Sequence, residues 1–474
     1  PIVITGSPTL YATVFAARNC CNTVSITRCS YLVIKNLELN GGGVFVDAVK
    51  GEGTAGNWAH HITVEYLHIV GYDADQQSVG ISTKCPAWNW TIRKNRIIGA
   101  GTGLYLGNSD GGKPFVNGLI EDNLVMNTIG YNMEIKHQRD GEREQLPGTA
   151  VDGRTIIRRN VFCKEQDAST GAMARPNVLL GAFPSTGPGA EDVYEVYGNF
   201  FYQNPNEALL QVTGNTALYA NVFVNHFDPS GFRAVYVTAQ NGFQPRRIWV
   251  FHNTVWTANS SGGIRLYNPN TSFTQYCHAN AVFSASPVTG FPDATDNVTG
   301  AYTDAAQFML AAASDLATLD LYPRQDMLTG PETPVAPFTG FTDAERDFNG
   351  AVYDWRYRGA YSGCCVNPGW KLQLDTMSRG TQGTSAMAAP PAATAFEVWP
   401  NPATNSVNIR WDEGGSLDVT LSLHDLLGRS VRSFQIPASA GRVTFPLQGI
   451  PHGVYFLQLH TAGGTTHRRI IVSP

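Results

Sequence analysis

The chain has 474 residues, and its 33 basic and 38 acidic side chains give a formal net charge of −5 at pH 7. No run of lysine and arginine stands out, so we expect no nucleic-acid partner. No stretch approaches the roughly 20 apolar residues that a membrane-spanning helix needs. The 48 glycines and the 11% aromatic residues favour many short strands joined by tight turns, which predicts an all-β fold.

Residues 1–6, Pro-Ile-Val-Ile-Thr-Gly, predict a strand and a turn and not a secretory leader. We therefore expect the numbering to start inside a longer precursor, with a leader and an N-terminal cap before it. The cap is expected because the open end of a stack of strands exposes an edge that can pair with other chains.

The eight cysteines are even in number, which permits disulfide bonds in an exported protein. None of their spacings matches a zinc site. Two pairs are adjacent in sequence, and we expect their members to bond to more distant cysteines rather than to each other. The cysteines are Cys20, Cys21, Cys29, Cys85, Cys163, Cys277, Cys364 and Cys365.

A degenerate repeat runs through the first 300 residues as short β-rich segments, most of which carry an asparagine at a similar place. The spacing varies, because 199 − 160 is 39 residues whereas 221 − 199 is 22. Such variation fits a solenoid whose coils keep their strands and vary their loops. The repeated positions are Asn36, Tyr66 in a variant without asparagine, Asn95, Asn123, Asn160, Asn199, Asn221, Asn253 and Asn280.

The asparagine has a physical role in a parallel β-helix, whose coils stack at the usual strand spacing of about 4.8 Å. We expect each asparagine to take a left-handed backbone at a bend and to bond the asparagine one coil away. The flanking apolar residues should point inward, and a second run in each coil should form its next face. An ordinary β-sandwich would instead require hairpin turns. The flanking residues are Ile92, Ile97, Leu119, Leu124, Val161, Phe200, Val222 and Phe251.

The repeat ends near residue 300. Residues 305–319 predict a short helix, and residues 301–380 are expected to run back along the outside of the coils or to cap their end. Residues 381–395 are small residues and prolines without periodicity, which predicts a linker. Residues 396–474 alternate short strands with turn residues, which predicts a small, immunoglobulin-like β-sandwich.

Residues 1–300 resemble the right-handed parallel β-helix of pectate-lyase-like proteins. The resemblance lies in the repeat and therefore implies fold more than function.

Residues 396–474 resemble the type A sorting domain of type IX secretion substrates. The similarity rests on Pro-Asn-Pro at 400–402, the Asp425-x-x-Gly428 turn, the Gly453-x-Tyr455 strand and a basic final strand. It implies a Bacteroidota-type bacterium, contact with the type IX machinery, and an extracellular or outer-membrane surface location. In that family the domain is usually cleaved after export.

A cluster of ionisable residues suggests a catalytic site. A polysaccharide lyase needs a base and a cation, whereas a glycoside hydrolase needs two carboxylates. Glu134 and Lys136 share one face of a predicted strand, and His137 and Arg139 follow where a long loop begins. The alternative is a solvated ion pair worth less than about 1 kcal/mol.

Aromatic residues are candidates for stacking on sugar rings, although aromatic side chains inside the coils are an equal alternative. The carbohydrate-binding candidates are Trp88, Trp90 and Tyr105, with Trp249 and Trp256 as weaker ones.

Two further features suggest other sites. Asp73, Asp75 and Gln76 offer oxygen ligands for a calcium ion. Thr376, between Asp375 and a methionine, fits an O-glycosylation acceptor resembling those of Bacteroidota.

Two functions remain open. One is a secreted or cell-surface carbohydrate-active protein, a polysaccharide lyase acting on uronate-containing glycans. The other is a non-catalytic adhesin, glycan-binding protein or structural subunit of an extracellular assembly.

Overall fold

The computed structural model describes residues 1–7, 12–16, 22–53, 56, 58–147, 149, 152–165, 168–229, 231–377, 396–411, 419–424, 430–437, 441–461 and 464–473. The chain divides into two compact units, residues 1–5 with 13–379 and residues 6–12 with 380–474. The predicted linker, residues 381–395, lies outside the described residues. The predicted domain boundaries therefore stay predictions.

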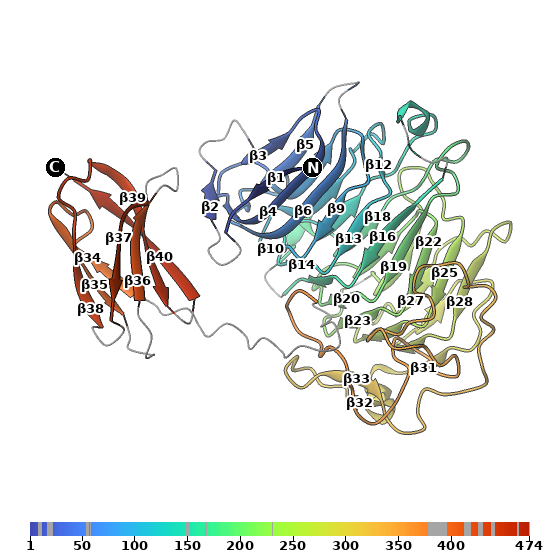
Figure 1. Ribbon diagram of the computed structural model, residues 1–474. Coiled ribbons are helices and arrows are strands. Elements are labelled where there is room, and N and C mark those ends of the chain that lie inside the picture. Colours follow the sequence, from blue (N-terminus) through green and yellow to red (C-terminus); the bar gives the residue numbers. More distant parts are fainter. Residues whose placement is uncertain are drawn as a thin grey trace. The chain divides into compact units, whose positions relative to one another are not determined.

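The larger unit is a parallel β-solenoid, as predicted, with two long sheets (Figure 1). Each strand pairs with the equivalent strand one coil away, and these pairings are parallel. A β-sandwich would need antiparallel hairpins, so this pairing excludes it for residues 1–300.

Within the described residues, sheet A has 21 strands. They are β1 Ile2–Thr5, β2 Ala12–Phe15, β4 Ser30–Asn40, β6 Ala59–Val70, β8 Ala87–Trp88, β9 Thr91–Arg93, β10 Arg96–Ile98, β12 Phe115–Val116, β13 Leu119–Glu121, β14 Leu124–Met126, β16 Arg154–Arg158, β17 Val161–Cys163, β19 Val193–Tyr197, β20 Phe200–Tyr202, β22 Thr216–Tyr219, β23 Val222–Asn225, β25 Ile248–Phe251, β26 Thr254–Thr257, β28 Gln275–His278, β29 Ala281–Phe283 and β31 Val298–Gly300.

Sheet B has ten strands in the part of the chain that the structure describes. They are β3 Val24–Ile26, β5 Val49–Glu52, β7 Val79–Lys84, β11 Thr102–Leu106, β15 Met133–Ile135, β18 Val178–Leu180, β21 Leu210–Val212, β24 Val235–Val237, β27 Ile264–Leu266 and β30 Val288–Thr289.

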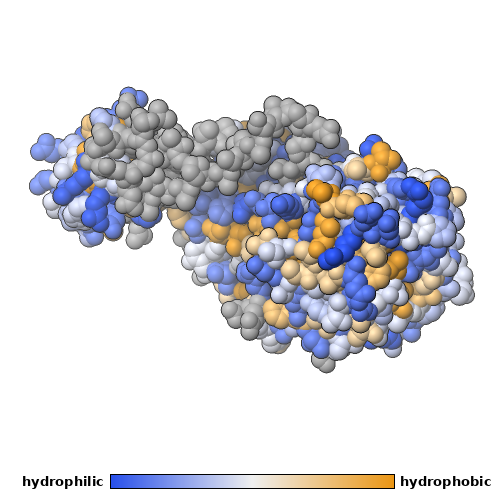
Figure 2. All heavy atoms as spheres, turned by 90° about the horizontal axis from the view of Figure 1, so that it is seen from below, coloured by the Kyte–Doolittle hydropathy of each residue, from blue (hydrophilic) through white to orange (hydrophobic). Residues whose placement is uncertain are grey.

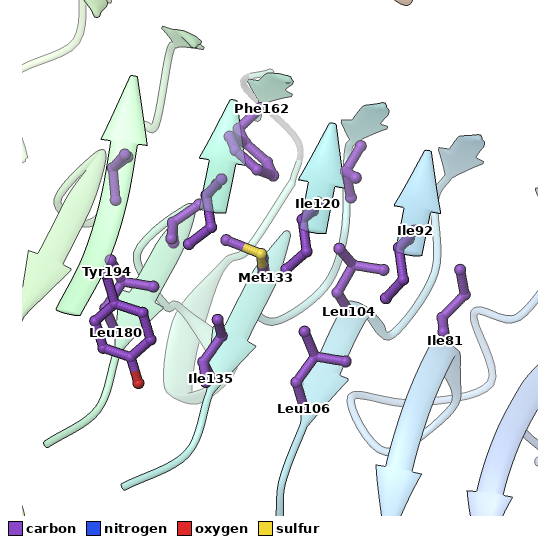
Figure 3. Packing of buried hydrophobic residues seen from close by; sticks show 14 of the residues in the cluster. Ile81, Ile92, Leu104, Leu106, Ile120, Met133, Ile135, Phe162, Leu180 and Tyr194 are labelled. Carbon is purple, nitrogen blue, oxygen red and sulfur yellow. The ribbon is translucent and has the colours of Figure 1, made fainter. Parts of the chain in front are cut away.

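Apolar columns fill the interior of the coils (Figure 3). In sheet B, Ile81, Leu104 and Met133 are aligned on successive coils, and each is fully buried. In sheet A, Ile92 and Ile120 form a facing column. Burying such a side chain contributes about 1.5–3 kcal/mol, so the stacked columns supply most of the stability of the solenoid.

A ladder of buried asparagines runs along one corner, as predicted. Each side-chain amide donates to the side-chain oxygen of the next asparagine at 2.8–3.0 Å, and the same oxygen accepts the backbone N–H of the preceding one. The ladder thus satisfies buried backbone groups that the bend would otherwise leave without partners. Its members are Asn95, Asn123, Asn160, Asn199, Asn221, Asn253, Asn280 and Asn297.

The predicted left-handed asparagine is wrong by one position. The residue before each ladder asparagine has the positive φ, for example Lys94 at 55° and Arg159 at 54°. Asn36 itself has φ 55° and aligns with that preceding position, not with the ladder. The bend thus needs the left-handed residue, while the asparagine after it supplies the hydrogen bonds.

The prediction that all the flanking apolar residues point inward is also wrong. Ile92 and Ile97 belong to the interior cluster, whereas Leu119 is half-buried. The others belong to two clusters outside the coils, where residues 301–377 cover sheet A. These outward residues are Leu124, Val161, Phe200, Val222 and, in a separate cluster, Phe251.

Residues 301–377 therefore return along the outside of the coils, one of the two predicted arrangements. The predicted helix of residues 305–319 is mostly wrong, because only α1, Ala305–Phe308, is helical, and β32, Met309–Ala311, follows directly. β32 pairs antiparallel with β33, Asp320–Pro323. The described residues of the unit also contain the short 3₁₀ helices η1 Arg143–Gln145, η2 Gly171–Met173 and η3 Tyr302–Asp304.

Cys364 and Cys365 form a disulfide with each other. For this pair, the disulfide corrects the prediction that adjacent cysteines bond to more distant ones. Cys20 and Cys21 lie outside the described residues. Cys29, Cys85, Cys163 and Cys277 are free thiols.

The smaller unit has two antiparallel sheets that share one apolar core containing Ile409 and Leu457. One sheet has the order β34-β35-β38 and the other β37-β36-β39-β40. The strands are β34 Phe396–Trp399, β35 Ser406–Trp411, β36 Val419–His424, β37 Ser430–Ile436, β38 Arg442–Pro446, β39 Gly453–Thr461 and β40 Gly464–Val472.

The motifs of the smaller unit have structural roles. Asn401, in the Pro-Asn-Pro segment, accepts a hydrogen bond from the backbone N–H of Ile471 in the last strand, at 2.9 Å. The Tyr455 hydroxyl donates to the Pro451 carbonyl oxygen at 2.8 Å. The predicted turn at 425–428 lies outside the described residues.

The surface is mixed. Figure 2 shows apolar residues in separate patches among polar ones on one face of the molecule. None of the helices in the described ranges has the length and apolar character to cross a bilayer.

Replacing an asparagine inside the ladder should destabilise the solenoid more than replacing the last one. Asn221→Leu removes partners from Asn199 and Asn253, and each buried group left without a partner costs about 1–3 kcal/mol. We expect the free energy of unfolding in urea to fall by about 3 kcal/mol or more. Asn297→Leu, at the half-buried end, is the matched control and should cost less; equal losses at both positions would contradict the ladder's role.

The return segment should depend on its aromatic anchor. Phe338 is fully buried and stacks on Phe251, with ring centroids 4.2 Å apart. Phe338→Ala should cost about 3–5 kcal/mol and expose the segment to limited proteolysis. Val352→Ala, at an exposed position of the same segment, should leave both unchanged. Unaltered proteolysis of Phe338→Ala would show that this contact does not hold the segment.

Candidate functional site

The outer face of sheet B carries the predicted catalytic cluster. Ser82, Tyr105 and Glu134 occupy the same position on successive coils. Their neighbours in each strand point into the core, so alternation along the strand turns these three outward. The column continues with Leu179 and Gln211 on the next coils.

Two lysines converge on Tyr105. The Lys84 ammonium lies 3.9 Å from the centre of the tyrosine ring, and the Lys136 ammonium lies 4.9 Å from it. Gly107 occupies the equivalent position on the coil between the two lysines, with φ 92°. A side chain there would approach the Lys136 Cβ to 3.1 Å, so the glycine leaves room for both lysines over the ring.

Burial changes the acidity of these groups. It raises the pKa of the Glu134 carboxyl, whose pair with Lys136 at 2.5 Å works in the opposite direction. Burial also lowers the pKa of the Lys84 ammonium, against the attraction of Asp47. Burial raises the pKa of the Tyr105 phenol to about 12. At neutral pH, Tyr105 is therefore a proton donor, and Lys84 loses its proton more readily than an exposed lysine.

His137 faces a different loop from the lysines. Its Nδ1 lies 2.9 Å from Asn241 Nδ2, an N–H donor, so in the neutral ring Nε2 carries the proton. Burial lowers the pKa of His137, which favours this neutral form. A Cβ on Gly111 would lie 2.7 Å from His137 Nε2, so that glycine makes space for the ring edge.

Arg139 is half-exposed and pairs with Glu142 at 2.5 Å, beside the cluster. The structure therefore brings together Glu134, Lys136 and Tyr105 from the predicted residues. His137 lies one residue beyond them, and Arg139 is bound to another partner.

Trp90 and Trp88 do not present a face to solvent, which corrects their prediction as sugar-binding residues. Trp90 is fully buried in the interior and donates its Nε1–H to the Ala59 carbonyl oxygen at 2.9 Å. Trp88 is 3% exposed and stacks on His60 at 4.4 Å. Only Tyr105 of the three stays a candidate.

The weaker candidates Trp249 and Trp256 contact the return segment. Trp249 packs against Phe341, and the Trp256 Nε1–H donates to the Tyr302 carbonyl oxygen at 2.9 Å.

The calcium prediction stays a prediction. Asp75 accepts the backbone N–H of Gln77 at 2.6 Å, and the Gln76 side chain donates to the Met173 carbonyl oxygen. In the described part of the chain, no three His, Cys, Asp or Glu side chains gather as metal ligands would.

The predicted glycosylation site also stays a prediction. Thr376 is half-buried, and its backbone N–H donates to the Asp375 carboxylate at 2.6 Å. Asp375 in turn pairs with Arg96 of sheet A.

Sequence reasoning missed Lys84. The register of β7 with β11 places Thr83 beside Leu106, and therefore Lys84 at the position of Lys136 two coils later. The strand register is the signal that identifies it.

Comparison with known proteins addresses the smaller unit. Residues 397–473 match the family model of the secretion system C-terminal sorting domain. Among curated proteins, none matches the chain. The resemblance to type IX sorting domains is thereby confirmed. Residues 397–473 are a secretion system C-terminal sorting domain, and this is a secreted or cell-surface protein that engages the type IX secretion machinery.

Proposed function

We propose that the protein binds uronate-containing glycans on the outer face of sheet B and cleaves them by β-elimination. The observation that carries this proposal is the pair of lysines, Lys84 and Lys136, on either side of Tyr105. The Lys136 ammonium offers a partner for the carboxylate of an acidic sugar, the Tyr105 ring offers one for its apolar face, and Lys84 offers a base.

The source is a Bacteroidota-type bacterium, with the protein at its outer-membrane surface or outside the cell.

Lys136 binds the substrate carboxylate. Glu134 uses one of the three N–H groups of its ammonium, and the others are available to a uronate. Neutralising the carboxylate makes the hydrogen on the adjacent carbon more acidic, which is the requirement of a lyase.

Lys84 is the base. Its pKa is lowered by burial, and a neutral amine accepts a proton. His137 is less suited, because its accepting nitrogen faces Asn241. The Tyr105 phenol, protonated at neutral pH, is the proton donor.

The elimination moves one proton from the substrate to Lys84 and one proton from Tyr105 to the leaving group. The Lys84 amine removes the hydrogen α to the carboxylate, and the electron pair of that C–H bond forms the new double bond to the adjacent ring carbon. The glycosidic C–O bond on that carbon breaks, and the leaving oxygen takes the Tyr105 proton. The Lys84 ammonium then returns its proton to the Tyr105 phenolate, directly or through water.

A non-catalytic glycan-binding protein is the second candidate. It is favoured by the ion pair of Lys136 with Glu134, because Glu134 already neutralises the positive charge that a lyase would direct at the substrate carboxylate. Binding without cleavage would then be the function of the same face.

Removal of the base should slow cleavage strongly and spare binding. With polyuronates as substrates, the wild-type protein should produce unsaturated ends that absorb ultraviolet light, and Lys84→Gln should be about 10²–10⁴ times slower. Lys94→Gln is the matched control, because Lys94 lies 5.3 Å from the Tyr66 ring centre outside sheet B. Binding of polyuronate by wild type without any absorbance change would favour the second candidate; absence of binding would reject both.

Cleavage should accelerate as pH rises, because the base is active only after the Lys84 ammonium loses its proton. Burial places the pKa of Lys84 below its ordinary value of 10.5, so the rate should level off below pH 10.5. Initial rates across the alkaline range test this. A rate that is constant or falls from neutral pH upward would contradict Lys84 as the base.

A further inference from the structure

A cavity of about 290 Å³ opens beside the candidate site. Its walls come from the loops that follow β18, β21, β24 and β27, which leave sheet B at the same edge as Lys136 and His137. The main lining residues are Phe183, Thr213, Asn215, Phe243, Arg246 and Phe273.

Phe243 connects the cavity to the candidate site. Its ring lies 5.6 Å from the His137 ring, and the neighbouring Asn241 hydrogen-bonds the same histidine at 2.9 Å. The loop after β24 thus reaches back to the coil of β15. A glycan on the outer face of sheet B would meet this cavity at the end of its path past Lys136.

The polar lining is held in place. Asn215, 1% exposed, donates its two amide hydrogens to the carbonyl oxygens of Ala190 and Asp192. The Thr213 hydroxyl donates to the Thr238 carbonyl oxygen at 2.8 Å. A preformed wall of this kind loses little conformational freedom when it binds a ligand.

Arg246 supplies hydrogen-bond donors. Its guanidinium donates to the carbonyl oxygens of Pro184, Ser185 and Ala190 at 2.8–3.0 Å. These bonds use three of the five N–H groups of an arginine, so two remain for a ligand. The guanidinium carbon lies 6.0 Å from the Phe273 ring centre, which places a donor beside an aromatic face.

We propose that this cavity binds one pyranose residue of a glycan, with the sugar against Phe243 and Phe273 and its hydroxyl groups bonded to Arg246. The volume lies at the lower end of the roughly 300–1,000 Å³ of ligand sites, which suits a single ring. Aromatic faces with a few fixed donors are the chemistry that recognises a sugar. The inference extends the proposed function, because the site would fix the register of a glycan chain relative to Lys84 and Lys136.

Saturation-transfer NMR with free monosaccharides tests the cavity on the full chain. Galacturonate, glucuronate, galactose, glucose and mannose are offered one at a time at millimolar concentration. We expect at least one to bind wild type, with about tenfold weaker affinity in Phe273→Ala. Phe273→Leu keeps the apolar volume without the flat ring and should also weaken binding. Tyr31→Ala, which removes a 54% exposed aromatic ring elsewhere, should bind as wild type.

Absence of binding by every monosaccharide would overturn the cavity proposal, as would unchanged binding in Phe273→Ala. The proposed function is tested separately with polyuronates. A protein that binds monosaccharides in the cavity but no polyuronate would reject the proposed function alone. If the protein cleaves polyuronates but Phe273→Ala leaves monosaccharide binding unchanged, only the cavity proposal would be rejected.

Discussion

The architecture of this protein depends on identical side-chain amides that hydrogen-bond from one coil to the next. At the bent corner of each coil, a ladder asparagine uses its side-chain amide in hydrogen bonds as both donor and acceptor. Fully buried Asn160, for example, donates to the Ile120 carbonyl oxygen and to Asn199, and it accepts from Asn123. A buried amide without these partners would be costly, so the ladder holds successive coils in one register. That register in turn decides which residues of sheet B stand side by side on the outside.

The outer face of sheet B therefore follows from the core. Leu104 and Met133 must stack inside, which forces Tyr105 over Glu134 outside. The loops, in contrast, are free to vary in length because they do not contribute to the stack. Loops after β18, β21, β24 and β27 use this freedom to build a cavity beside the face. A rigid stack with variable loops thus provides both a flat surface and a local pocket.

Much of this architecture could be predicted from the sequence, because the asparagines and their apolar neighbours repeat. The exact bend could not, since residues as different as Lys94, Ala220 and His252 all take the left-handed conformation. The orientation of Leu124 and Phe200 could not be predicted either. Both faces of these strands are apolar, and only the return of residues 301–377 explains the outer one.

The candidate site was partly predictable for the same reason. Glu134 and Lys136 are neighbours in one strand, so alternation identifies them. Lys84 comes from a coil two turns earlier, and variable loops hide that register from the sequence. The sequence also does not show that Tyr105 is only half-buried beside the two lysines, whereas Trp88 is buried and stacks on His60.

A crystal structure with a short oligouronate bound would locate the substrate on the solenoid. It should show a carboxylate within hydrogen-bond distance of the Lys136 ammonium, with the adjacent C–H directed at Lys84 and the sugar beside Tyr105. An oligouronate bound on sheet A or on residues 397–473, with the outer face of sheet B empty, would contradict it.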